Sequence, residues 1–152
     1  MKLLSSAFAN FETIPIKYTG EGEDISPPLR WQDIPEGTRS LALICEDPDA
    51  PNGAWDHWIL YNIPPTIGVL AEGIKELPQE IHSGVNSWKK TGYGGPNPPS
   101  GSHRYFFTLY ALDTVLQLPE KTTKISLLNA MQSHTLAEAS LVGCYERTES
   151  KK

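Results

Sequence analysis

The apolar run at residues 40–46 (SLALICE) constrains the fold of this chain more than any other segment. Its centre, 41–45, contains no polar residue, so a strand formed here would have both of its faces covered by other parts of the protein. Such a strand suits the middle of a sandwich better than a sheet that is covered on one side only. A second apolar run, 58–63 (WILYNI), follows after one loop, and we expect it to form a neighbouring, antiparallel strand.

The rest of the chain is dominated by strand and turn signals. Further strands are expected at 13–18, 81–88, 105–112 and 141–146. Residues 123–139 favour a helix, because Thr123 can cap it and Ile125, Leu128 and Met131 lie on roughly one face. With 13 prolines in the intervening segments, these patterns predict one mainly β domain spanning residues 1–152. Strand spacing alone does not distinguish a sandwich from a barrel.

Composition excludes several classes of function. The formal net charge is −5 and no Lys/Arg cluster is present, which argues against nucleic acid as a ligand. No run approaches the roughly 18 apolar residues of a membrane span, and the segment 1–11 is too short for a secretory signal. We therefore expect a cytoplasmic protein without an integral membrane segment. Cys45 and Cys144 both lie in apolar runs and are expected to be buried free thiols.

The loop at 47–57 (DPDAPNGAWDH) connects the two apolar runs and carries the first candidate site residues. Asp47 and Asp49 follow the first strand, and His57 precedes the second. Pro51 and the Asn-Gly pair after it stiffen the loop. Polar side chains on a stiff loop at the end of a buried strand indicate one wall of a binding pocket.

A second loop, 93–104 (YGGPNPPSGSHR), indicates the opposite wall. Gly94 and Gly95 allow close approach of the backbone to a ligand, and free N–H groups in such a loop can bind an anion. His103 lies where this loop meets the strand at 105–112, as His57 does at the start of its own strand.

Each of these residues also has an ordinary structural interpretation. Asp before Pro commonly opens a turn, which would explain Asp47 and Asp49 without any ligand. A histidine at a strand end is often simply half-buried. The functional interpretation depends on finding the two histidines, the two aspartates and the glycine-rich loop together.

Four motifs, taken in order, resemble the phosphatidylethanolamine-binding protein family, also called Raf kinase inhibitor-like proteins. They are DPDAP (47–51), WDH (55–57), GPNPP (95–99) and GSHRY (101–105), and the resemblance extends over nearly the whole chain. It implies a β-sandwich around a large antiparallel sheet, with one helix in the C-terminal half packed at its side. It also implies a cis Ala50–Pro51 peptide. The ligand-binding positions that it implies are Asp47, Asp49, Pro51, His57, Gly94, Gly95, Pro96, His103 and Tyr105.

A division of labour within that pocket can be stated as a hypothesis. Backbone N–H groups near Gly94 and Gly95 and the two imidazoles would donate to a phosphate-like anion. Asp47 would orient one imidazole, and Tyr105 would close the pocket as an aromatic wall. The carboxylates should raise the pKa of the histidines, so anion affinity should strengthen below about pH 6.5. Arg104 points to the opposite face of its strand and is expected to form a structural ion pair.

Three functions remain open on the sequence. The first is a non-catalytic protein that binds a small anion, such as phosphate or a phospholipid headgroup, with no cofactor and no metal. The second is a metal-assisted hydrolase using the His and Asp residues, although the chain lacks a tight H-x-x-x-H or H-x-H pair. The third, by resemblance alone, is a regulator that inhibits a partner such as a kinase. A homodimer is also consistent with the resemblance.

Overall fold

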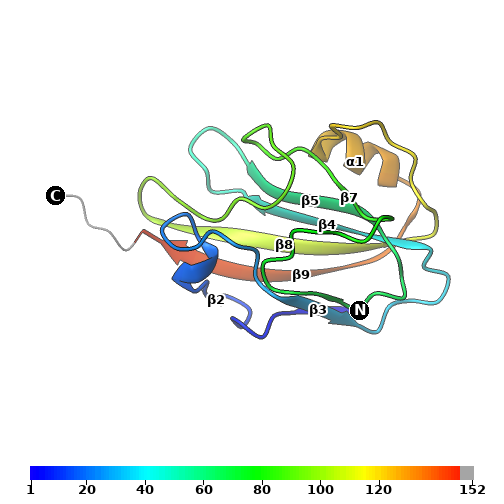
Figure 1. Cartoon of the computed structure of the whole chain (residues 1–152), viewed down its shortest axis with the longest axis horizontal. Coiled ribbons are helices and arrows are strands. Elements are labelled where there is room, and N and C mark those ends of the chain that lie inside the picture. Colours follow the sequence, from blue (N-terminus) through cyan, green and yellow to red (C-terminus); the bar gives the residue numbers. More distant parts are fainter. Residues whose placement is uncertain (148–152) are drawn as a thin grey trace.

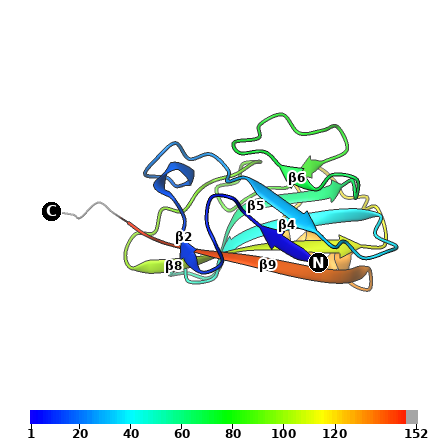
Figure 2. The same cartoon turned by 90° about the horizontal axis from the view of Figure 1, so that it is seen from below.

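The computed structural model describes residues 1–147, and the last five residues of the predicted domain, 148–152, lie outside the described part. The described chain forms a three-layered arrangement of a small sheet, a large sheet and a helix (Figure 1). Figure 2 shows the small sheet lying across one face of the large one. The large sheet has the strand order β2-β9-β8-β4-β5-β7, and the small sheet the order β1-β3-β6.

The elements follow the chain in a mainly β succession. They are β1 (Lys2–Leu4), β2 (Glu12–Thr13), a 3-10 helix (Ile16–Tyr18), β3 (Leu29–Gln32), β4 (Ser40–Asp47), β5 (Trp55–Ile63), β6 (Val69–Leu70), β7 (His82–Ser83), β8 (Ser102–Leu112), α1 (Lys124–Met131) and β9 (Thr135–Glu146). The large sheet ends in β2 on one edge and in β7 on the other, so it is open. The predicted mainly β sandwich with one helix is confirmed.

Strand β4 occupies the position that its apolar run predicts. It pairs antiparallel with β5 on one side and with β8 on the other. Alternate residues serve the two faces of the sheet: Leu41 and Leu43 pack in the core beneath the small sheet, whereas Ala42 and Ile44 pack in the core beneath α1. None of these four side chains is more than 2% exposed. Continuous apolar sequence is therefore explained by cover on both faces.

The N-terminal strand prediction is wrong in extent. Only Glu12–Thr13 forms a strand, and it pairs parallel to β9, the one exception in an otherwise antiparallel sheet. The residues that follow form a 3-10 helix, in which Tyr18 N donates to Pro15 O at 3.0 Å. Pro15 has no N–H for a sheet ladder and its fixed φ suits a helix start, so it ends the strand.

The helix prediction is correct at its start and wrong at its end. Thr123 caps α1 as expected, and its side chain accepts a hydrogen bond from Ser126 N. The helix stops at Met131, and Ser133 then adopts a left-handed φ of 70°. Beyond this turn the chain enters β9, which pairs with β8 over its whole length. The long ladder overrides the helical pattern of 132–139 because it pairs β9 with β8 along the whole strand.

Two smaller expectations have mixed outcomes. Both cysteines are free, but only Cys45 is buried, and Cys144 is half-buried. Burial raises the pKa of the Cys45 thiol well above its ordinary value. Within residues 1–147, no helix combines the length and the apolar character that a bilayer span needs.

Candidate functional site

The ends of three inner strands of the large sheet, β4, β5 and β8, lie side by side and form a cavity there. Asp47 ends β4, while His57 and His103 lie near the starts of β5 and β8. Because both neighbours run antiparallel to β4, their first residues lie beside its last ones. The resulting cavity measures about 240 Å³. Its lining consists of Asp47, Ala50, Pro51, Trp55, His57, Trp88, Asn97, Pro98, Pro99, His103 and Tyr105. We call it the anion cavity.

A register irregularity in β5 turns His57 into this cavity. Trp58 pairs with Cys45 and Asp56 pairs with Glu46, so His57 is an extra residue between two consecutive pairs. A bulge of this kind redirects a side chain that regular alternation would send to the other face. His57 consequently contacts Tyr105 of β8, with the two rings edge to face and their centroids 5.2 Å apart.

The hydrogen bond made by His57 determines which of its nitrogens faces a ligand. Its Nδ1 lies 2.7 Å from the carbonyl oxygen of Gly94. A carbonyl only accepts, so Nδ1 carries the proton, and Nε2 of the neutral ring is an acceptor. The ring is 3% exposed. Burial lowers the pKa of His57, and this outweighs the raising effects of the Gly94 hydrogen bond and of nearby carboxylates. The carboxylates do act in the predicted direction, but the predicted net rise in the pKa of this histidine is wrong because burial has the larger effect.

His103 and Asp47 form a buried pair on the opposite wall. His103 Nδ1 lies 2.6 Å from Asp47 Oδ2, and the other carboxylate oxygen, Oδ1, accepts from Asp49 N at 2.8 Å. The two residues are 7% and 4% exposed. The predicted contact that orients an imidazole through Asp47 is thus present. As in His57, Nδ1 is the donor and Nε2 remains for a ligand.

Aromatic rings complete the cavity. Tyr105 is 1% exposed and lies beside both imidazoles, with its ring stacked on that of His103 at 6.4 Å. Burial raises the pKa of its hydroxyl, which therefore stays protonated. At the rim, Trp55 and Trp88 meet edge to face at 5.5 Å, and Trp88 also packs on His57 at 5.1 Å. Trp88 was missed in the sequence analysis, although it lies just before the 93–104 loop, because it belongs to none of the four motifs.

Asp49 is not part of the cavity lining. Its carboxylate accepts from Arg104 three times, from the backbone N at 2.9 Å, from Nε at 2.9 Å and from Nη2 at 2.8 Å. These hydrogen bonds lower the pKa of Asp49 to about 2. The expected structural ion pair of Arg104 is confirmed, and its partner is one of the residues expected in the pocket. Asp49 therefore ties the 47–57 loop to β8.

The glycine-rich loop supplies backbone oxygen to the site, not free N–H groups. Gly94 N donates to His57 O at 3.0 Å, and Gly95 N donates to Asp24 Oδ1 at 2.7 Å. The expectation that these amides bind an anion is wrong, because both already have acceptors. Gly95 is required for a different reason: a Cβ there would lie 2.4 Å from the carbonyl oxygen of Tyr18. The neighbouring Pro96 O accepts from Gly20 N at 2.8 Å, which anchors the loop.

The expectation of a cis Ala50–Pro51 peptide is also wrong, because all peptide bonds of the described residues are trans. Gly53 N donates to Ala50 O at 3.3 Å, which makes Pro51 the second residue of a four-residue turn. That position favours a trans proline with its ordinary φ, whereas a cis proline belongs at the third position. Pro51 still lines the cavity.

The opposite face of the same strands carries a charged cluster that secures the bulge. Lys124 Nζ of α1 lies 2.5 Å from Glu46 Oε1 and 3.1 Å from Asp56 Oδ1. Glu46 and Asp56 are paired across β4 and β5 next to the bulge. Nowhere among residues 1–147 are three His, Cys, Asp or Glu side chains grouped so that they could hold a metal ion.

Comparison with known proteins agrees with this architecture. The sequence model of the family described as phosphatidylethanolamine-binding protein matches residues 4–146. A UPF0098 protein of Methanothermobacter thermautotrophicus is 50% identical over 97% of this chain and 99% of its own length. A UPF0098 protein of Chlamydia pneumoniae is 48% identical over 97% of this chain and 100% of its own length.

Two solved structures share the fold. A phosphatidylethanolamine-binding protein homologue from Chlamydia trachomatis is 45% identical, with a TM-score of 0.91 over 96% of this chain and 97% of its own. YbcL from E. coli, described as a new member of the mammalian family, is 30% identical, with a TM-score of 0.91 over 97% and 98% of the two chains. The chain therefore belongs to the phosphatidylethanolamine-binding protein family.

Proposed function

We propose that this protein binds a small phosphate-like anion in the anion cavity and does not catalyse a reaction there. The observation that carries the proposal is the pair of buried imidazoles whose Nδ1 atoms are both fixed by acceptors of the protein. Fixing Nδ1 sets the orientation of each ring and leaves its Nε2 for a ligand. His57 and His103 would contact the anion, Asp47 would orient His103, and Tyr105 would form the aromatic wall.

The size of the cavity supports a small ligand. A volume of about 240 Å³ lies below the range of roughly 300–1,000 Å³ that is typical of drug-sized ligands. Inorganic phosphate or the headgroup of a phospholipid is small enough for such a space. The two rim tryptophans, 37% and 41% exposed, would cover the part of a headgroup that extends beyond the phosphate.

Protonation determines whether the cavity attracts an anion. With both rings neutral, each Nε2 presents a lone pair, and Asp47 adds a negative charge. An imidazole can then donate to a phosphate oxygen only when a proton is placed on its Nε2. Otherwise the ligand itself must carry the proton. We place the donor to the anion on Nε2 of His103, because the other nitrogen of this ring faces the Asp47 carboxylate.

The other candidate roles have less support. The metal-assisted hydrolase would need several protein ligands converging on one ion, and no group of three His, Cys, Asp or Glu side chains among residues 1–147 is arranged in that way. Regulation of a kinase and formation of a homodimer stay predictions that rest on the family resemblance. Ligand binding in the anion cavity would then control whether such a partner binds.

The test compares two asparagine variants. In His103→Asn, the amide Nδ2 takes the place of Nδ1 and can still donate to Asp47, but the group at Nε2 is lost. His134→Asn is the matched control, because His134 makes the same kind of bond, Nδ1 to Asp113 Oδ1 at 2.8 Å, on the exposed surface. The ligands are inorganic phosphate and O-phosphorylethanolamine, measured by titration calorimetry near pH 6.

A charge-assisted hydrogen bond contributes about 1.5–3 kcal/mol, so His103→Asn should weaken binding by at least about tenfold. The control should bind like the wild type. Tighter binding of O-phosphorylethanolamine would identify a headgroup ligand, and equal binding would identify free phosphate. An anion that binds the His103→Asn variant as tightly as the wild type would contradict the proposal.

A further inference from the structure

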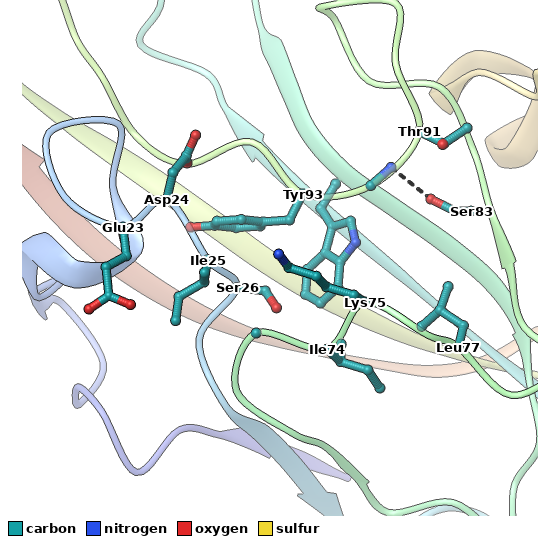
Figure 3. A pocket seen from close by; sticks show the side chains of 13 residues that line it. Glu23, Asp24, Ile25, Ser26, Ile74, Lys75, Leu77, Ser83, Thr91 and Tyr93 are labelled. Atoms are coloured by element: carbon teal, nitrogen blue, oxygen red, sulfur yellow. Dashed lines mark hydrogen bonds between the residues drawn. The ribbon is translucent and has the colours of Figure 1, made fainter.

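A second cavity lies beside the first and is larger. It measures about 430 Å³ and shares no lining residue with the anion cavity (Figure 3). Gly92 and Tyr93 form part of its wall, while the next residue, Gly94, contacts His57 of the anion cavity. The 92–95 loop therefore separates the two spaces. We call the second space the Trp58 cavity, and its volume falls within the range of sites for small organic ligands.

The inner wall of the Trp58 cavity is aromatic and rigid. Trp58 is 2% exposed and meets Tyr93 edge to face, with centroids 5.4 Å apart and planes at 79°. Tyr93 is held in place because its hydroxyl donates to Tyr18 O at 2.7 Å. Ile74 and Leu77 extend the apolar surface on another loop. Such a wall favours an apolar side chain or a ring.

Charges of opposite sign stand on two loops around this wall. Lys75 comes from the 73–77 loop, whereas Glu23 and Asp24 come from the 23–26 segment (Figure 3). No salt bridge within residues 1–147 involves Lys75 or Glu23. Asp24 uses one oxygen, Oδ1, to accept from Gly95 N. An ammonium and two carboxylates are thus available at one mouth.

Two hydroxyl groups in the wall have unused hydrogen-bonding capacity. Ser26 is 2% exposed, and its Oγ has no hydrogen-bond partner in the described chain. Ser83 Oγ accepts from Gly92 N at 2.9 Å, which leaves its own proton to donate. A buried hydroxyl without a partner is costly, and a ligand oxygen that reached it would remove this cost.

We propose that the Trp58 cavity binds a small zwitterion of the amino-acid type with an apolar side chain. The side chain packs on Trp58 and Tyr93. The carboxylate of the ligand pairs with Lys75, and its ammonium group pairs with Glu23. A ligand with both charges matches the charges of both signs at the mouth, whereas a simple anion or cation leaves one side of the mouth unmatched.

Three probes that differ only in their charged groups test this assignment. L-phenylalanine carries both groups, phenylacetate lacks the ammonium and phenethylamine lacks the carboxylate. Binding is followed by NMR through the indole N–H signal of Trp58, identified among the four tryptophans with Trp58→Phe. L-phenylalanine should shift this signal and bind most tightly. Each truncated probe should bind about twofold to fivefold more weakly, as expected for an exposed ion pair.

Charge variants assign each end of the ligand. Lys75→Met should weaken L-phenylalanine and phenylacetate but not phenethylamine, and Glu23→Gln should weaken L-phenylalanine and phenethylamine but not phenylacetate. Lys121→Met, on an exposed lysine that does not line the cavity, controls for net charge. His103→Asn should bind all three probes like the wild type, which separates this site from the anion cavity.

Three results would overturn the proposal. The first is a Trp58 signal that none of the probes shifts. The second is a truncated probe that binds as tightly as L-phenylalanine. The third is loss of binding in His103→Asn, which would place the probe in the anion cavity.

Discussion

The anion cavity should take up a proton when it binds a fully ionised anion, and this prediction can be made quantitative. In both histidines Nδ1 donates to an acceptor of the protein, at 2.7 Å for His57 and at 2.6 Å for His103. Neutral rings therefore offer only lone pairs at Nε2. Of the groups in contact with the two rings, Asp47 brings a negative charge and Tyr105 a protonated hydroxyl. We expect a bound dianion to draw at least one further proton onto an Nε2.

Linkage gives the magnitude. If the protein takes up one proton, the association constant for a fully ionised anion falls about tenfold for each pH unit, which equals about 1.4 kcal/mol per unit. Between about pH 7 and pH 8, the affinity should therefore drop about tenfold.

Sulfate is the most suitable probe, because it does not titrate in this range and any proton must bind to the protein. Calorimetric titration in two buffers with different ionisation heats counts the protons directly. We expect about one proton per sulfate near pH 8 in the wild type. An affinity that stays flat from about pH 5 to pH 8, with equal heats in the two buffers, would refute the reasoning from the fixed Nδ1 atoms.

Three other changes probe the construction of the site. Replacing Lys124 by Met should cost about 1–3 kcal/mol in the free energy of unfolding measured with urea, because two half-buried carboxylates then face each other unneutralised; no loss would show that the cluster is not structural. His57→Asn keeps a donor to the Gly94 carbonyl but cannot titrate. Because the pKa of His57 is lowered in the folded state, the unfolded chain binds the proton more strongly. In parallel denaturation curves, the free energy of unfolding of the wild type relative to this variant should therefore fall as the pH drops from about 7 to 5. A difference that stays constant over this range would contradict the prediction. Gly95→Ala should cost about 3 kcal/mol by steric overlap, while Gly68→Ala, where an added Cβ finds no atom closer than 3.7 Å, should stay within about 1 kcal/mol; equal melting temperatures would argue against the overlap.

The sequence predicted the centre of the fold well, and the reason is physical. The apolar residues 41–45 predicted burial on both faces, and β4 indeed lies between two strands, with one hydrophobic core on each face. The C-terminal end of β4 sets where the 47–57 loop begins, and the antiparallel pairing with β8 brings the 93–104 loop to the same end. The placement of Asp47 and His103 at the same end of these inner strands follows from this arrangement.

The failures arise where long-range pairing or local geometry decides. Residues 132–139 carry a helical pattern, but the ladder with β8 makes them part of β9. The position of His57 depends on a bulge that is defined only by the register between two strands. Likewise, the N–H groups of Gly94 and Gly95 looked free in the sequence because their acceptors, His57 O and Asp24, lie far along the chain. Hydrogen bonds of this kind cannot be read from composition or spacing.

The most direct test of the proposed function is a crystal structure of the protein with phosphate, grown near pH 6. We expect a phosphate in the anion cavity with one oxygen within about 3 Å of His103 Nε2, while His103 Nδ1 still donates to Asp47. A phosphate held elsewhere on the molecule, or an anion cavity that stays without phosphate at concentrations that saturate the protein in solution, would contradict it.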